Sequence, residues 1–74
     1  MRVINLDAIG IKLIANNKKQ LYLSKKDVAD LLNKNYTIDD NVLCVNNKLL
    51  KMTDNDVTEF DTILEYIAAN FGNI

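Results

Sequence analysis

Histidine, proline and tryptophan are absent from the 74 residues, and cysteine occurs once, at Cys44. Without histidine, the chain lacks the commonest acid–base group and the commonest protein ligand for metals. A single cysteine excludes an intramolecular disulfide, and there is no cysteine pair to hold zinc. Because no nucleophile–base pair or ligand set is present, we expect a non-enzymatic protein with no catalytic residue, cofactor or metal.

Long apolar runs are also missing. The segment "MRVINLDAIGIKLIA" is apolar, but Asn5, Asp7 and Lys12 interrupt it well short of the ~20 residues of a membrane helix. Lysine outnumbers arginine eight to one and asparagine is abundant, which is typical of AT-rich coding sequences such as those of low-GC bacteria and their phages. We therefore expect one domain over residues 1–74 in the cytoplasm (the host-cell cytosol if phage-encoded), with no membrane partner.

A pattern of turn, apolar run and helix cap occurs twice. "NNKKQLYLSKKDVADL" begins at residue 16 and "NNKLLKMTDNDVTEF" begins at residue 46. Asparagine tolerates positive φ, so Asn-Asn between apolar runs predicts a tight hairpin turn. Ser24 and Thr53 follow as N-caps, each with an aspartate three residues later, which is capping-box spacing. The pattern predicts a candidate internal repeat over residues 9–34 and 42–72, each copy containing a strand, a turn, a strand and a helix.

The two predicted helices differ in length. The first is expected from Lys25 to Asn33, and the second from Asp54 to Phe71 with Gly72 as its C-cap. Apolar residues recur every three or four positions along the second helix, so one face would pack on the sheet. In the alternative, this apolar stripe forms a homodimer. The stripe comprises Val57, Phe60, Leu64, Ile67, Phe71 and Ile74.

Together these elements predict the α+β class. We expect a small antiparallel sheet from two β-hairpins, each followed by a capped α-helix (ββα repeated), with an extra N-terminal strand "RVINL" and both helices on one face. In the strand "IGIKLIA", Ile9, Ile11 and Leu13 would share the buried face because side chains alternate along a strand. Cys44, inside the apolar strand "NVLCV", is expected to be a small core residue.

Charge divides the chain into halves of opposite sign. Residues 1–34 carry seven basic and three acidic side chains, net +4, whereas residues 35–74 carry two and seven, net −5. The leading hypothesis is a protein-interaction module, such as a phage- or mobile-element-encoded regulator or inhibitor, that occludes a partner's surface with its acidic half. A further alternative is a self-assembling subunit, in which the basic half of one copy meets the acidic half of another. The candidate acidic contacts are Asp54, Glu59, Asp61 and Glu65.

The alternative function is a small DNA-binding transcriptional regulator with a basic patch. Lys25 and Lys26 lie in the first turn of the first helix, where the helix dipole disfavours cations, and Lys18 and Lys19 lie in the preceding turn. Free N–H groups at a helix start, with lysines beside them, suit a phosphate. Tyr22, between the two lysine pairs, would stack on a base.

The segment "YLSKKDVADLLNKN" resembles the helix-opening segment of phage antirepressor Bro-N domains and the first helix of excisionase-type winged helices. Both resemblances cover these fourteen residues and depend on capping and helix patterning. In an excisionase a recognition helix follows at once, whereas "YTIDDNVLCVNN" predicts a loop and a strand here. The chain departs from that family at the element that would read DNA, so no family is assigned.

Overall fold

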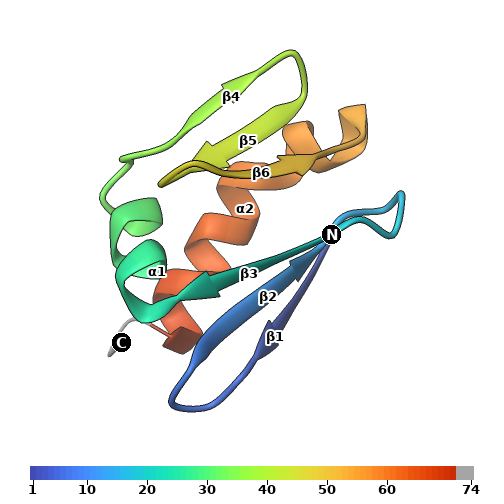
Figure 1. Cartoon of the computed structure of the whole chain (residues 1–74). Helices are drawn as coiled ribbons and strands as arrows, with labels where there is room; N and C mark the ends of the chain where they lie inside the picture. Colours follow the sequence, from blue (N-terminus) through green and yellow to red (C-terminus); the bar gives the residue numbers. More distant parts are fainter. Residues whose placement is uncertain (72–74) are drawn as a thin grey trace.

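The computed structural model describes residues 1–71 and shows a small α+β fold with two three-stranded antiparallel sheets and two helices (Figure 1). The predicted fold class is therefore confirmed. The elements in chain order are β1 (Arg2–Asn5), β2 (Gly10–Ile14), β3 (Gln20–Ser24), α1 (Lys25–Leu32), β4 (Thr37–Asp39), β5 (Val42–Val45), β6 (Lys48–Lys51) and α2 (Asp54–Phe71).

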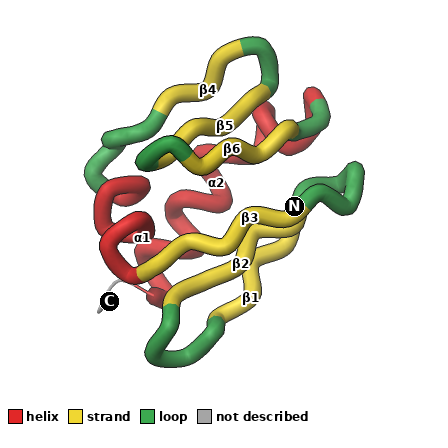
Figure 2. The backbone as a smooth tube through the Cα atoms, in the orientation of Figure 1, coloured by secondary structure: helices red, strands yellow, loops and turns green. Residues whose placement is uncertain are grey.

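The single predicted sheet is wrong, because the strands form two sheets of order β1-β2-β3 and β4-β5-β6. The segment expected to be a loop contains β4, which pairs with β5. Three strands and a helix thus follow each other twice; we call β1–β3 with α1 unit 1, and β4–β6 with α2 unit 2. The two sheets meet where β3 and β6 lie side by side, and α2 passes behind them (Figures 1 and 2).

Positive φ angles occur in the hairpin turns, and one turn has them at the two asparagines for which they were predicted. Asn46 and Asn47, which connect β5 to β6, have φ values of 50° and 67°, and Asp40 and Asn41, which connect β4 to β5, have 56° and 64°. Two-residue turns with positive φ at both positions match the right-handed twist of the strands. The β2–β3 connection is a three-residue turn that ends with Lys18 at φ 71°.

Gly10 begins β2 directly against the backbone of β3. Its φ is 145°, and a Cβ atom here would overlap the carbonyl oxygen of Leu23, so glycine is required. This irregular start corrects the predicted strand face: Ile9 lies in the preceding turn and is 74% exposed, whereas Ile11 and Leu13 are fully buried as predicted.

Both capping boxes are formed. Ser24 Oγ accepts a hydrogen bond from the Asp27 N–H (3.2 Å), and the Asp27 carboxylate accepts one from the Ser24 N–H (3.0 Å). Thr53 and Asp56 make the same pair of bonds at 3.2 and 2.9 Å. The first helix ends at Leu32, one residue earlier than predicted, with Asn33 as its C-cap. The second has the predicted bounds, and the predicted cap at Gly72 lies outside the described residues, as does Ile74.

One hydrophobic core takes side chains from both units. The apolar stripe of α2 packs inside this core: Phe60, Leu64, Ile67 and Phe71 are buried and Val57 is partly buried. The predicted packing of this face inside the domain is thus confirmed, and the face that the homodimer alternative requires is covered by the chain itself. Cys44 also departs from its prediction. It is only partly buried and pairs with the exposed Leu49 on the outer face of the second sheet, because the core side of β5 is taken by its neighbours.

Candidate functional site

The four predicted acidic residues all lie on α2, but they do not form one surface. At 3.6 residues per turn, Asp54, Asp61 and Glu65 fall within about 40° of one another around the helix, and Glu59 lies about 140° from Asp54. Asp54 accepts a hydrogen bond from Asn41 Nδ2 (2.6 Å). Glu59 binds the α-amino group of the chain (2.6 Å). Two of the four carboxylates are therefore used within the molecule.

Asp61 and Glu65 remain exposed beside the C-terminal end of α1. They line a shallow hollow of about 380 Å³ together with Lys34 and the apolar side chains Leu32 and Leu64. The hollow combines a small apolar floor with two carboxylates, so it is the part of the acidic set that is available to a partner.

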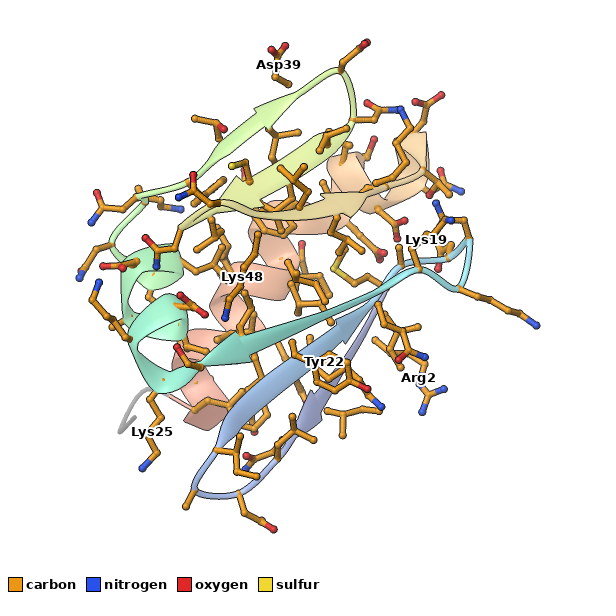
Figure 3. All side chains as sticks on the ribbon, viewed as in Figure 1. Arg2, Lys19, Tyr22, Lys25, Asp39 and Lys48 are labelled. Carbon is orange, nitrogen blue, oxygen red and sulfur yellow. The ribbon has the colours of Figure 1, made fainter. Side chains whose placement is uncertain are left out.

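The structure separates the two lysine pairs that the sequence places in one patch. Lys18 and Lys19 lie in the β2–β3 turn, whereas Lys25 and Lys26 begin α1 at the other end of β3. Six residues of extended chain place the two pairs about 20 Å apart, and Figure 3 shows Lys19 and Lys25 at opposite ends of the sheet. A phosphate held jointly by both pairs is therefore excluded.

The start of α1 is already supplied with a carboxylate. Asp27 and Ser24 form the capping box there, which satisfies N–H groups that an anion would otherwise bind. Lys26 Nζ lies 3.1 Å from Asp30 one turn later. These two aspartates offset the unfavourable position of Lys25 and Lys26 against the helix dipole. We infer that Lys25 and Lys26 are solvated residues at the start of α1 and do not form an anion site.

Basic and aromatic side chains gather instead on the outer face of the first sheet. The strand register aligns Lys12 with Ile4 and Tyr22 across the three strands, and paired residues of antiparallel strands share a face. Tyr22 is 57% exposed, and Lys12 Nζ lies over its ring, 5.4 Å from the ring centroid. The face consists of two central rows, neither of which contains an acidic residue: Ile4, Lys12 and Tyr22, then Arg2, Ile14 and Gln20.

A hollow of about 410 Å³ lies at the turn end of this face. Arg2, Lys18, Asn16 and Gln20 supply its polar lining, and Ile14 contributes to its apolar lining. Figure 3 shows Arg2 and Tyr22 on the same side of the first sheet, with Lys19 beyond them on the turn. The hollow thus offers two cations and two amides next to an exposed aromatic ring.

The sequence hypothesis included Lys18, Lys19 and Tyr22 but missed Arg2 and Lys12. Strand alternation could have identified Lys12. It lies between the buried Ile11 and Leu13, so its side chain must be on the opposite face of the sheet. Arg2 joins the same face only through the pairing of β1 with β2, which single-sequence reasoning does not specify.

A second group of charged residues is structural. Asp27 is buried, and its carboxylate binds Lys48 at the start of β6 and Nδ2 of Asn46 in the β5–β6 turn, the latter at 2.7 Å. We call these three residues the Asp27 cluster; Figure 3 shows Lys48 between the two units. Burial of the carboxyl raises its pKa, but the hydrogen bonds from Lys48, Asn46 and Ser24 outweigh that effect and lower the pKa below its ordinary range.

The corresponding residue of unit 2 makes the reciprocal contact. Asp56 is fully buried, and its Oδ2 accepts a hydrogen bond from the main-chain N–H of Asn16 in the β2–β3 turn (3.1 Å). Its Oδ1 lies 3.4 Å from the α-amino group of Met1. We call these residues the Asp56 cluster. Here too burial raises the carboxyl pKa, and hydrogen bonds from Thr53, Asn16 and the α-amino group lower it further than burial raises it.

Each capping aspartate therefore binds the hairpin turn of the other unit, and the two clusters join the units. No helix within residues 1–71 has the length and apolar composition to cross a membrane. Comparison with protein-family models, curated proteins and solved structures finds no match to this chain.

Proposed function

We propose that this chain is a small, non-enzymatic regulator of the cytosol that binds nucleic acid through the outer face of its first sheet and acts by occupying that partner's surface. The observation that supports the proposal is that Arg2, Lys12 and Lys18 lie on the same side of the first sheet as the exposed Tyr22. Arg2 and Lys12 belong to the sheet face, and Lys18 and Lys19 belong to the turn at its end. Cations bind the phosphates, while an aromatic ring provides a stacking surface for a base.

A comparison of the two repeated units also supports this proposal. The residues that the two units share are turn asparagines and capping residues, which build hairpins, helix starts and the contacts between units. The outer faces of the two sheets differ, because Lys12 and Tyr22 pair on the first sheet and Cys44 and Leu49 pair on the second. We infer that one repeated structural arrangement carries a binding face on unit 1 that unit 2 does not have.

The test is anisotropy of a fluorescent oligonucleotide, measured across about 50 to 200 mM salt. With three or four phosphate contacts, the logarithm of the binding constant should fall with the logarithm of salt with a slope of about −2 to −3 for a single strand. The double variant Lys18→Asn/Lys19→Gln should weaken binding and reduce this slope by about 1.4. Asparagine is used at position 18 because the backbone there has positive φ.

A matched control is available within the chain. The variant Lys25→Gln/Lys26→Gln also removes two positive charges, but at the far end of β3. It therefore changes the net charge by the same amount as the turn variant. The proposal requires the turn variant to lose much more affinity than this control. Equal losses would mean a general charge effect, and an absence of binding at the lowest salt would overturn the proposal.

A second candidate retains the leading sequence hypothesis, that the acidic unit 2 occludes a protein partner. The hollow lined by Lys34, Asp61 and Glu65 favours it, because Leu32 and Leu64 add apolar surface there. Binding of a lysine-rich fluorescent peptide should then be lost in Asp61→Asn/Glu65→Gln. It should be kept in Asp39→Asn/Asp40→Asn, which removes two negative charges at the exposed β4–β5 turn.

A further inference from the structure

Tyr22 lies on the exposed basic face, directly beside the central strand of the first sheet. It belongs to β3, and its cross-strand neighbour Lys12 belongs to the central strand β2. Its alternate neighbours Leu21 and Leu23 are buried in the core, so the tyrosine backbone is held rigidly while its ring stands in solvent. An exposed aromatic ring on a strand whose neighbouring side chains are buried is a stacking surface with little ordering cost.

The geometry also sets a distance between this ring and the polar hollow. Gln20, which lines the hollow with Arg2 and Lys18, lies two residues before Tyr22 on β3, and two strand residues span about 7 Å. That distance is short enough for one nucleic-acid strand to contact both the ring and the hollow. A base on the tyrosine would therefore place a phosphate of the same strand at the hollow.

From this arrangement we propose that the ligand of the outer face is a single-stranded nucleic acid, with one base stacked on Tyr22 and neighbouring phosphates bound by Lys12 and by Arg2 and Lys18 at the hollow. This inference rests on the proposed function and names the class of nucleic acid. Stacking displaces Lys12 from the ring, and its ammonium group then lies beside the adjoining phosphate.

A duplex does not fit the same surface. The major groove of DNA is about 12 Å wide and admits one helix or a two-stranded ribbon, whereas this face is three strands wide. Both helices lie on the core side of the sheets, where α1 buries Val28 and Leu31 and α2 buries its apolar stripe. Bases in a duplex are already stacked and present no free face to a tyrosine.

The experiment compares oligothymidine with a duplex of the same length, using Tyr22→Leu, Tyr22→Phe and the control Tyr66→Leu. Tyr66 is also exposed, at 47%, but lies on α2. We expect the single strand to bind more tightly than the duplex. Tyr22→Leu should lower single-strand affinity roughly fivefold to a hundredfold, Tyr22→Phe should retain it, and Tyr66→Leu should leave it unchanged. Circular dichroism confirms that each variant is folded.

Two failures are distinguishable. If the Lys18→Asn/Lys19→Gln variant loses affinity but Tyr22→Leu does not, or the duplex binds as tightly as the single strand, the single-strand inference is overturned and the proposed function stands. If wild-type protein binds neither oligonucleotide at low salt, both are overturned.

Discussion

Unit 1 and unit 2 have the same order of elements and the same capping chemistry, yet they present different surfaces. Each places three antiparallel strands before a helix that begins with a hydroxyl N-cap and an aspartate three residues later. In each, that aspartate is buried against the other unit's hairpin turn. The shared residues are thus explained by architecture alone.

The outer faces of the two sheets show where the units diverge. The outer face of the first sheet has Lys12 beside the exposed Tyr22, whereas the second has Cys44 beside the exposed Leu49. No structural contact requires a lysine over an exposed tyrosine. The comparison teaches that the repeated turn and capping residues are explained by folding, whereas the pair Lys12 and Tyr22 on the outer face of unit 1 is not.

We expect acid to have the largest effect on the free energy of unfolding, because it protonates the aspartates of both inter-unit clusters. The pKa values of Asp27 and Asp56 are below their ordinary value of 3.8. As the pH falls, these carboxyl groups therefore take up protons at a higher pH in the unfolded chain than in the folded one. Their contribution to the free energy of unfolding is complete above about pH 4 and is lost as pH falls through and below that value. Urea unfolding between pH 2 and 7 measures it. A stability that does not fall below pH 4 would contradict the assignment.

Alkali should distinguish the clusters, because only the Asp56 cluster contains an amino terminus. The hydrogen bond to Glu59 raises the α-amino pKa above its ordinary value of 8.0, more than burial lowers it. This contribution is present below pH 8 and is lost as pH rises through the raised value. The same unfolding series extended to pH 10 should show a modest decline.

Asp56→Ala should be the most damaging single substitution of the comparison. The aspartate is fully buried. Its removal leaves the N–H groups of Thr53 and Asn16 without their acceptor and the nearby α-amino group without this carboxylate. We expect a loss of about 3 to 5 kcal/mol in the free energy of unfolding. Asp27→Ala should cost less, since its partner Lys48 is partly exposed and regains water. The reverse order in urea titrations would contradict the account.

Gly10→Ala should destabilise unit 1 at a place that has no counterpart in unit 2, whose first hairpin closes with Asp40 and Asn41. The added Cβ overlaps the Leu23 carbonyl and the φ of 145° is strained for alanine. About 2 to 3 kcal/mol should be lost. Thermal unfolding measures this, and a change smaller than that of Ala8→Gly, in the exposed turn just before it, would contradict the reason given.

The paired turn residues Asn46 and Asn16 should respond unequally. Asn46 binds Asp27 through its side-chain amide, whereas Asn16 binds Asp56 through its main chain. Asn46→Gly keeps the positive φ but removes the amide, and should cost about 1 kcal/mol. Asn16→Gly keeps the main-chain bond and should cost less, losing only an exposed side-chain contact to the α-amino group. Equal costs in the same urea assay would show that the side chain of Asn46 is not the donor that matters.

Local chemistry made the β2–β3 and β5–β6 turns, both caps and the bounds of α2 predictable from the sequence. Asn46 and Asn47 specify their turn, and Ser24 with Asp27 and Thr53 with Asp56 specify helix starts. These signals act over a few residues, so tertiary contacts did not override them.

Long-range pairing was not predictable in the same way. The three-residue strand β4 is too short to show a period, so the second sheet and its separation from the first were missed. The candidate site was incompletely predicted for the same reason. Lys18 and Lys25 are near in sequence but lie at opposite ends of β3, whereas Arg2 reaches Lys18 only because three strands pair in register.

The central claim, that unit 1 alone carries the binding face, is tested most directly by NMR. Backbone amide shifts of the ¹⁵N-labelled protein would be followed while oligothymidine is added. The account predicts shifts concentrated at Arg2, Lys12, Lys18 and Tyr22, with the equivalent positions of β5 and β6 unchanged. Shifts centred on the second sheet or on the Asp61–Glu65 side of α2, or equal shifts on both sheets, would contradict it.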